Sequence, residues 1–174
     1  MSYMTIQLIG FVAVCFSILT YQLNKRSHML ITETIAAFLY SLHFFLLGAM
    51  TGGAMNFIGG CRALVFYKYP PSKNNSWVLV LFITLAIIGT YLFWDGLVSL
   101  LALIGTIGYA ITYWQTNPKY IRRIMLLTFP AWFTYNIIVG SYPGMAIEII
   151  VLISNLTGQY RFDFRKTNLP TSKK

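Results

Sequence analysis

The chain has 174 residues, of which 57% are apolar and 10% are charged, and its mean hydropathy is +0.65. Soluble domains carry about 25% charged residues, so this composition excludes an ordinary soluble protein and predicts an integral membrane protein. The formal charge of +9 alone would suggest a nucleic-acid partner, but the positions of the basic residues indicate another cause.

Seven apolar segments follow one another along the chain, each near the ~20 residues that a helix needs to cross a bilayer. The third is short and reaches full length only if it includes residues 49–53. Pro130 lies inside the sixth and predicts a kink. We therefore expect an all-α integral membrane protein with seven transmembrane helices. The segments are residues 6–22, 29–47, 54–67, 77–93, 97–114, 121–139 and 145–160.

Two features outside the segments complete this outline. Residues 68–76 are rich in Pro, Ser and Asn, which is typical of a linker. The first five residues contain no Lys or Arg, unlike the basic start of a secretory signal peptide. We therefore expect the first segment to remain in the mature protein.

The basic residues lie on one side of the predicted segments. Of the thirteen Lys and Arg residues, twelve lie at ends that the chain reaches after an odd number of crossings, and Arg62 lies within the third segment. The positive-inside rule then predicts an N-terminus outside and a C-terminus in the cytoplasm. Membrane orientation explains the charge, so we expect no nucleic-acid partner. The twelve are Lys25, Arg26, Lys68, Lys73, Lys119, Arg122, Arg123, Arg161, Arg165, Lys166, Lys173 and Lys174.

The chain contains an internal repeat, which should be identified before the fold is assigned. The spacing predicts two parallel three-helix repeats, at residues 1–69 and 96–161. A loop and linker helix at residues 70–95 would join them, and residues 162–174 would form a cytoplasmic tail. Parallel repeats of this kind are known in small carriers. The matching pairs are Gln22 with Gln115 and Asn24 with Asn117, 93 residues apart, and Gly48 with Gly140 and Gly52 with Gly144, 92 residues apart.

These residues resemble the SWEET and PQ-loop transporter superfamily. Gln22 and Gln115 match the glutamine at the cytoplasmic end of the first helix of each repeat, and residues 38–48 and 131–140 resemble its aromatic second helix. The N-x-x-G of the third helix appears at residues 56–59. The resemblance implies a SWEET-like fold and a carrier function. The proline of the PQ motif is missing from both copies, so no sugar specificity is carried over.

The whole chain is also similar to the bacterial inner-membrane family called YgjV. Its members show H-F-F-L-L-G-A-x-T-G, found here at residues 43–52, and a closing G-x-Y-R-F-D, found at residues 158–163. The similarity covers most of residues 5–163. It implies a multi-pass protein of the bacterial inner membrane and says little about activity.

Four polar residues are predicted in one layer of the outer half of the membrane. His43, Asn56, Asn136 and Glu148 lie four or five residues from the outer turns, which places them about 6–7 Å deep at 1.5 Å per residue. Ionisable groups at such depth indicate a functional site, so we expect these residues to bind a substrate. For Asn56 and Asn136, hydrogen bonds between helices remain an equal alternative. A His43–Glu148 pair would allow proton coupling, because histidine titrates near neutral pH.

Further residues complete the predicted site. Tyr40, Trp132 and Tyr135 would supply aromatic walls, which solute sites need beside a few polar groups. Glu33 and Arg62 lie about 6–9 Å from the cytoplasmic side and predict an ion pair or inner gate, with Arg62 as an alternative binder of an anionic solute. The remaining aromatic residues at segment ends are predicted as interfacial anchors. They include Tyr3, Trp77, Trp94, Tyr113, Trp114 and Tyr160.

No enzyme is expected, because no nucleophile–base set, metal-ligand spacing or phosphate loop is present in the sequence. Cys15 and Cys61 lie inside apolar segments and are predicted to be buried, without a disulfide, metal or cofactor. Our leading hypothesis is a small carrier that moves a polar solute between the repeats by alternating access. The alternative is a membrane protein that does not transport, such as a receptor, an assembly factor or a lipid-binding module. Association of copies of the chain is left open.

Overall fold

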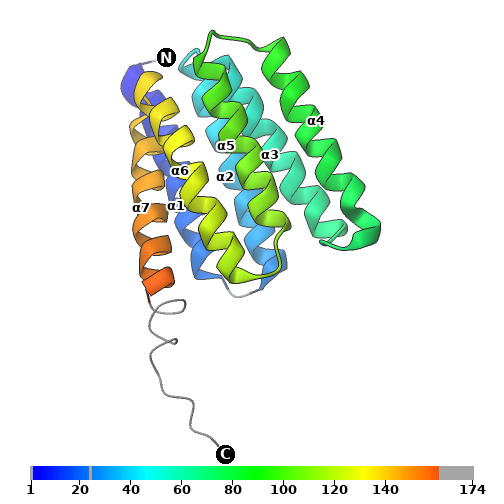
Figure 1. Cartoon of the computed structure of the whole chain (residues 1–174). Coiled ribbons are helices and arrows are strands. Elements are labelled where there is room, and N and C mark those ends of the chain that lie inside the picture. Colours follow the sequence, from blue (N-terminus) through cyan, green and yellow to red (C-terminus); the bar gives the residue numbers. More distant parts are fainter. Residues whose placement is uncertain (1, 24, 161–174) are drawn as a thin grey trace, which may run out of the picture.

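The computed structural model describes residues 2–23 and 25–160, and this part of the chain is all-helical. The predicted tail at residues 162–174 and Asn24 lie outside the described residues. A short 3₁₀ helix, η1 (Lys73–Asn75), follows the predicted linker's prolines. The α-helices are α1 (Tyr3–Gln22), α2 (Arg26–Leu46), α3 (Met50–Lys68), α4 (Ser76–Leu92), α5 (Val98–Trp114), α6 (Pro118–Ile138) and α7 (Tyr142–Gln159) (Figure 1).

The seven predicted segments are confirmed as helices, with ends that differ by at most four residues. The largest difference is at α3, which begins at Met50 and thereby includes the residues that it needed to reach full length. α6 continues through Pro130 as one helix. Side chains fix two helix starts: Asn117 accepts the Lys119 N–H at 3.0 Å, and Ser141 accepts the Gly144 N–H at 3.1 Å, as N-cap residues do.

Within the described residues, three helical stretches are long and apolar enough to cross a membrane: Tyr3–Thr20, Ser27–Leu46 and Lys73–Leu92. The helix Val98–Trp114 is apolar but shorter. Many large apolar side chains are exposed on the outside of the bundle, which is the surface that a lipid environment would cover. Cys15 is among the exposed residues rather than buried as expected, and Cys61 is partly buried. The exposed apolar residues include Leu8, Val80, Leu92, Ile104, Leu127 and Ile153.

Six of the helices form a closed ring. Along the ring, α1 packs against α2, α2 against α3, α3 against α5, α5 against α6, α6 against α7, and α7 against α1. α4 stands outside the ring at the edge of the bundle, packed against α3 and α5 (Figure 1). We call α1, α2 and α3 the first trio, and α5, α6 and α7 the second trio. The two trios meet at α3–α5 and at α1–α7.

The two ends of the bundle differ in character. The turns after α2, α4 and α6 lie at the end that also holds the N-terminus, and the other connections lie at the opposite end (Figure 1). Each of these three turns contains a glycine with positive φ: 81° at Gly48, 77° at Gly96 and 69° at Gly140. We call this the glycine end. The opposite, basic end carries Lys25, Lys68, Lys73 and Lys119.

The α2–α3 and α6–α7 turns share the same hydrogen bonding. The Ala49 N–H donates to the Phe44 carbonyl at 2.9 Å, and the Ser141 N–H donates to the Asn136 carbonyl at 2.9 Å. Both bonds span a glycine in the left-handed region, which a side chain would strain. The paired residues are 92 residues apart, the offset found between the glycines in the sequence.

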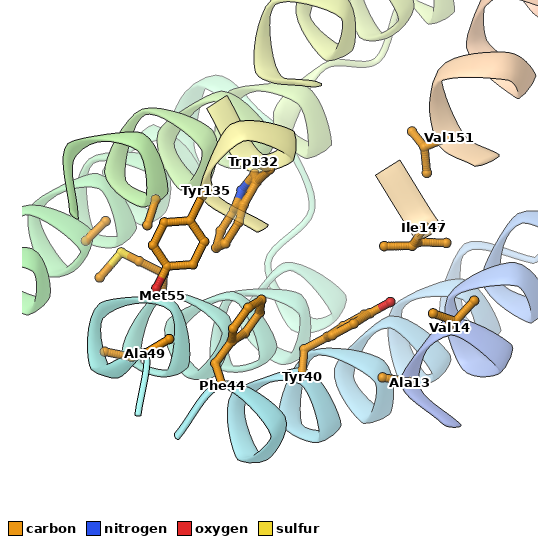
Figure 2. Packing of buried hydrophobic residues seen from close by; sticks show 13 residues of the cluster. Ala13, Val14, Tyr40, Phe44, Ala49, Met55, Trp132, Tyr135, Ile147 and Val151 are labelled. Atoms are coloured by element: carbon orange, nitrogen blue, oxygen red, sulfur yellow. The ribbon is translucent and has the colours of Figure 1, made fainter. Parts of the chain in front are cut away.

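Aromatic packing joins the two trios near the glycine end. Trp132 and Tyr135 reach from α6 toward Phe44 on α2 (Figure 2), with ring centroids 6.1 Å and 5.8 Å from that of Phe44. The Tyr135 hydroxyl lies directly against Gly52 on α3, where any side chain would overlap it. The close approach of α3 and α6 therefore depends on glycine at this position.

Candidate functional site

A cavity of about 100 Å³ lies in the centre of the ring, between the two trios. Its lining comes from all six ring helices, and the described residues that line it include none from α4. Seven residues that the sequence analysis singled out contribute to the lining. They are Glu33, Tyr40, Asn56, Arg62, Trp132, Asn136 and Glu148.

Glu148 on α7 is the buried carboxyl group of the cavity, with 6% of its surface exposed. Its Oε1 accepts a hydrogen bond of 3.1 Å from the Tyr109 hydroxyl on α5. Its Oε2 is buried and has no hydrogen-bond partner among the described residues. The pair with His43 that the sequence suggested is not formed, because both ring nitrogens of His43 contact other groups, the Ile6 carbonyl and Ser141 Oγ.

Arg62 on α3 is the buried cation of the cavity, with 4% of its surface exposed. Its guanidinium carbon lies 5.1 Å from the ring centroid of Tyr113 on α5, within the range of a cation–π contact. Arg62 and the partly buried Glu33 on α2 attract each other electrostatically, and the Tyr113 hydroxyl hydrogen-bonds to the Glu33 carboxyl. Glu33 and Arg62 thus lie near each other in the cavity lining, and their role as an ion pair or inner gate stays a prediction.

Tyr109 and Tyr113 connect these two charged groups. The tyrosines are one helical turn apart on α5, and their rings stack with centroids 6.2 Å apart. One hydroxyl bonds to Glu148 and the other to Glu33. A continuous polar strip of side chains therefore runs along one wall of the cavity, from its glycine-end half toward the basic end.

Much of the remaining lining is aromatic and aliphatic. Figure 2 shows Tyr40 and Phe44 from α2, Trp132 from α6, and Ile147 and Val151 from α7 around one interior space. All five are buried in the main core cluster, and all five line the cavity. Small-molecule sites are usually lined by apolar and aromatic side chains with a few polar groups among them.

Four buried polar atoms of lining residues have no hydrogen-bond partner among the described residues. They are Arg62 Nε, Trp132 Nε1, Asn136 Oδ1 and Glu148 Oε2. Buried polar atoms are almost always hydrogen-bonded, and each exception needs an explanation. Asn56 differs, because its Nδ2 donates to the Gly52 carbonyl of its own helix at 3.0 Å.

His43 and Tyr135, two residues predicted to bind substrate, do not line the cavity. His43 is fully buried, and its ring nitrogens lie 2.9 Å from the Ile6 carbonyl and 2.9 Å from Ser141 Oγ. The Tyr135 hydroxyl accepts the Gly52 N–H at 2.7 Å. Both contacts join one trio to the start of a helix in the other, between the cavity and the glycine end. We call them the two closing contacts.

The repeat-motif glutamines also lie away from the cavity lining. Gln115 follows α5 at the basic end, and its Nε2 donates to the Ile111 carbonyl at 3.4 Å. The side chain of Gln22 lies outside the described residues. Within residues 2–23 and 25–160, no group of three or more His, Cys, Asp or Glu side chains could hold a metal ion.

Sequence analysis missed two important residues of the lining, Tyr109 and Tyr113. Tyr113 was predicted to be an interfacial anchor, but it is partly buried and faces the cavity. The sequence spacing contained part of this information. Thr106, Tyr109 and Tyr113 are three and four residues apart, which places them on one face of a helix. All three line the cavity.

Comparison with known proteins assigns the chain to a family. A family model described as bacterial inner membrane protein, Imp-YgjV, matches residues 4–166. No curated protein and no solved structure has significant similarity to the chain. The resemblance to the SWEET and PQ-loop superfamily stays a prediction. Because the matched region runs from α1 to beyond α7, the chain belongs to the YgjV family of bacterial inner membrane proteins.

Proposed function

We propose that the protein is a small carrier that moves a polar solute through the inner membrane by alternating access. The solute would occupy the central cavity, and the two trios would move against each other as two parallel repeats. The N-terminus would lie outside and the C-terminus in the cytoplasm, so that the glycine end faces outward.

One observation carries this proposal: the central cavity draws its lining from every helix of both trios and contains buried polar atoms without partners among the described residues. A structural core of this size would be filled with apolar side chains or would satisfy its polar groups internally. Arg62 Nε offers a donor, and Asn136 Oδ1 and Glu148 Oε2 offer acceptors. A small polar solute with donor groups would complete the hydrogen bonds of the two acceptors.

The closing contacts support a mechanism of access. His43 with Ser141 and Tyr135 with Gly52 are buried between the cavity and the glycine end. Both contacts cross from one trio to the other, so a relative movement of the trios would break them together. Opening at the glycine end would then expose the cavity to the outside, and closure would return it to the present arrangement.

The proposed repeats differ at the positions that face the centre. With the offset of 92 residues, Asn56 matches Glu148 and His43 matches Tyr135. The two members of each pair have similar locations. Asn56 and Glu148 line the cavity, and His43 and Tyr135 make the closing contacts. The scaffold repeats while its chemistry differs between the two halves, which allows an asymmetric solute to bind in one orientation.

The test is solute uptake by the purified protein in liposomes, with a panel of small cations, anions, sugars, amino acids and neutral amides. We expect Asn56→Ala and Trp132→Ala to reduce the uptake of the active solute at least tenfold. Trp77→Ala is the matched control, because Trp77 is exposed on α4. Absence of flux for every member, with the Asn56 and Trp132 variants also silent in cells, would refute the carrier and favour a non-transporting role.

A further inference from the structure

The charged groups of the cavity are unevenly balanced, and this imbalance bears on the class of solute. Among the described lining residues, the carboxyl groups are Glu33 and Glu148, and the only basic group is Arg62. Arg62 and Glu33 attract each other and share Tyr113 as a neighbour. The described lining therefore holds one more carboxyl group than basic groups, and no basic side chain in it is paired with Glu148.

A carboxylate in this position needs a positive partner. Burying a charge without one is unfavourable in a protein interior, so a bound cation would stabilise the ionised form of this carboxyl group. Intramembrane carboxyl groups accordingly pair with another group or mark an ion pathway. The hydroxyl of Tyr109 satisfies Oε1 but brings no charge, and Oε2 is left without a partner in the described part.

The walls around Glu148 also suit a cation. Trp132, Tyr40 and Tyr109 line the same cavity, and aromatic rings attract ammonium and guanidinium groups, most strongly where water is excluded. The cavity has a volume of about 100 Å³, so its occupant is a small molecule rather than a segment of another protein.

From this geometry we propose that the solute is a small organic cation, with its positive charge held by Glu148 among the aromatic side chains of the cavity. Transport of the cation rests on the proposed function. Binding of the cation does not, because the cavity alone defines the ligand site. Ammonium, methylammonium and guanidinium have the required charge and size. A sugar would not stabilise the ionised form of Glu148, and an anion would be repelled by it.

The experiment compares two ligands of the same shape and different charge. Guanidinium and urea are both planar, small and rich in N–H donors, and only guanidinium is charged. Binding of each to the purified full chain in detergent is measured by calorimetry and by thermal stabilisation at low millimolar concentrations. We expect guanidinium and methylammonium to bind and urea and acetate not to bind.

Substitutions of Glu148 test whether this residue supplies the negative charge that holds the cation. Glu148→Gln keeps the shape of the side chain, and we expect it to weaken guanidinium binding at least tenfold. Asp95→Asn is the matched control, because it removes the same charge from an exposed residue at the glycine end. If Glu148→Gln does not fold, as judged by size-exclusion chromatography, Glu148→Asp serves instead, with weaker binding expected because the carboxylate is shortened.

The Arg62→Gln variant distinguishes a cationic ligand from an anionic one. Removing Arg62 leaves two carboxyl groups without a basic partner in the described lining, so binding of guanidinium should persist or become tighter. Loss of all binding in a folded Arg62→Gln protein would instead indicate an anion or a zwitterion held by Arg62, and would overturn the proposal. Binding of glycine but not of methylammonium would overturn it in the same way.

The outcomes distinguish this inference from the carrier proposal. Uptake of urea or a sugar without binding of any cation would refute the cationic ligand and leave the carrier intact. Binding of guanidinium without flux in liposomes would confirm the ligand class and refute the carrier.

Discussion

The Tyr135 hydroxyl on α6 accepts a hydrogen bond of 2.7 Å from the Gly52 N–H in the first turn of α3. The first four N–H groups of a helix have no partner within the helix, so a residue of the second trio satisfies a backbone group of the first. His43, the residue at the matching position of the first trio, bonds in turn to Ser141 at the start of α7. The trios are thus held together by two reciprocal contacts.

Tyr135→Phe should destabilise the closed arrangement. The variant removes the hydroxyl and leaves the Gly52 N–H buried without an acceptor, at a cost of about 1–3 kcal/mol. We expect a lower midpoint of thermal unfolding in detergent. Tyr91→Phe is the control, because Tyr91 is 81% exposed at the end of α4. An unchanged midpoint for Tyr135→Phe would show that the hydroxyl makes no contribution to stability.

A double-mutant cycle should detect the second closing contact. His43→Gln and Ser141→Ala each remove one side of the 2.9 Å contact between His43 Nε2 and Ser141 Oγ. We expect each single variant to lower stability by about 1–2 kcal/mol. The double variant should lose less than the sum, by about 0.5 kcal/mol or more. Full additivity, measured by chemical unfolding in detergent, would contradict a direct interaction.

The two matching turns should respond alike to alanine. Gly48 and Gly140 have φ values of 81° and 69°, and a non-glycine residue in the left-handed region costs about 1–2 kcal/mol. No neighbouring atom lies within 4 Å of a side chain placed at Gly48, so this loss is due to backbone strain alone. We expect similar decreases in thermal stability for Gly48→Ala and Gly140→Ala.

Gly158→Ala is the control for these turn variants. Gly158 lies inside α7, and its added methyl group would meet only Arg122 Cδ at 3.4 Å. Alanine is preferred over glycine in a helix interior by about 1 kcal/mol, so stability should be unchanged or higher. A loss equal to that of the turn variants would mean that φ is not the cause.

Cysteine labelling in intact cells should establish the orientation. In a chain with Cys15 and Cys61 replaced by alanine, Asp95→Cys places a thiol at the glycine end and Ser72→Cys places one at the basic end, both at exposed positions. We expect a membrane-impermeant maleimide to label position 95 and not position 72. Labelling of position 72 alone would reverse the assignment, and lysed cells provide the control in which both react.

The helices could be predicted from the sequence because each is bounded by glycine turns, prolines or basic residues, and because a bilayer demands nearly constant length. The end of α2 and the start of α3 show this, since Gly48 marks the turn by residue type alone. The central cavity was also partly predictable. Asn56, Asn136 and Glu148 are polar residues in apolar segments, and such residues face the interior of a bundle.

The rotation of each helix about its axis could not be predicted. His43 and Phe44 are adjacent in sequence, yet Phe44 lines the cavity and His43 makes a closing contact. A step of one residue turns a helix by about 100°, and amphipathic patterning usually reveals which face is buried. In this chain the outward face is as apolar as the inward face, so the pattern is absent. Tyr113 was misassigned for the same reason.

The position of α4 has a consequence for the origin of the chain. α4 packs against α3 and α5 but contributes no described residue to the cavity lining or to the closing contacts. In the proposed arrangement α4 crosses the membrane once, which lets two three-helix units joined end to end keep the same orientation. Such a chain could have arisen from a half-length protein that worked as a dimer. Gene fusion would then have required only the addition of one helix of sufficient length and apolar character.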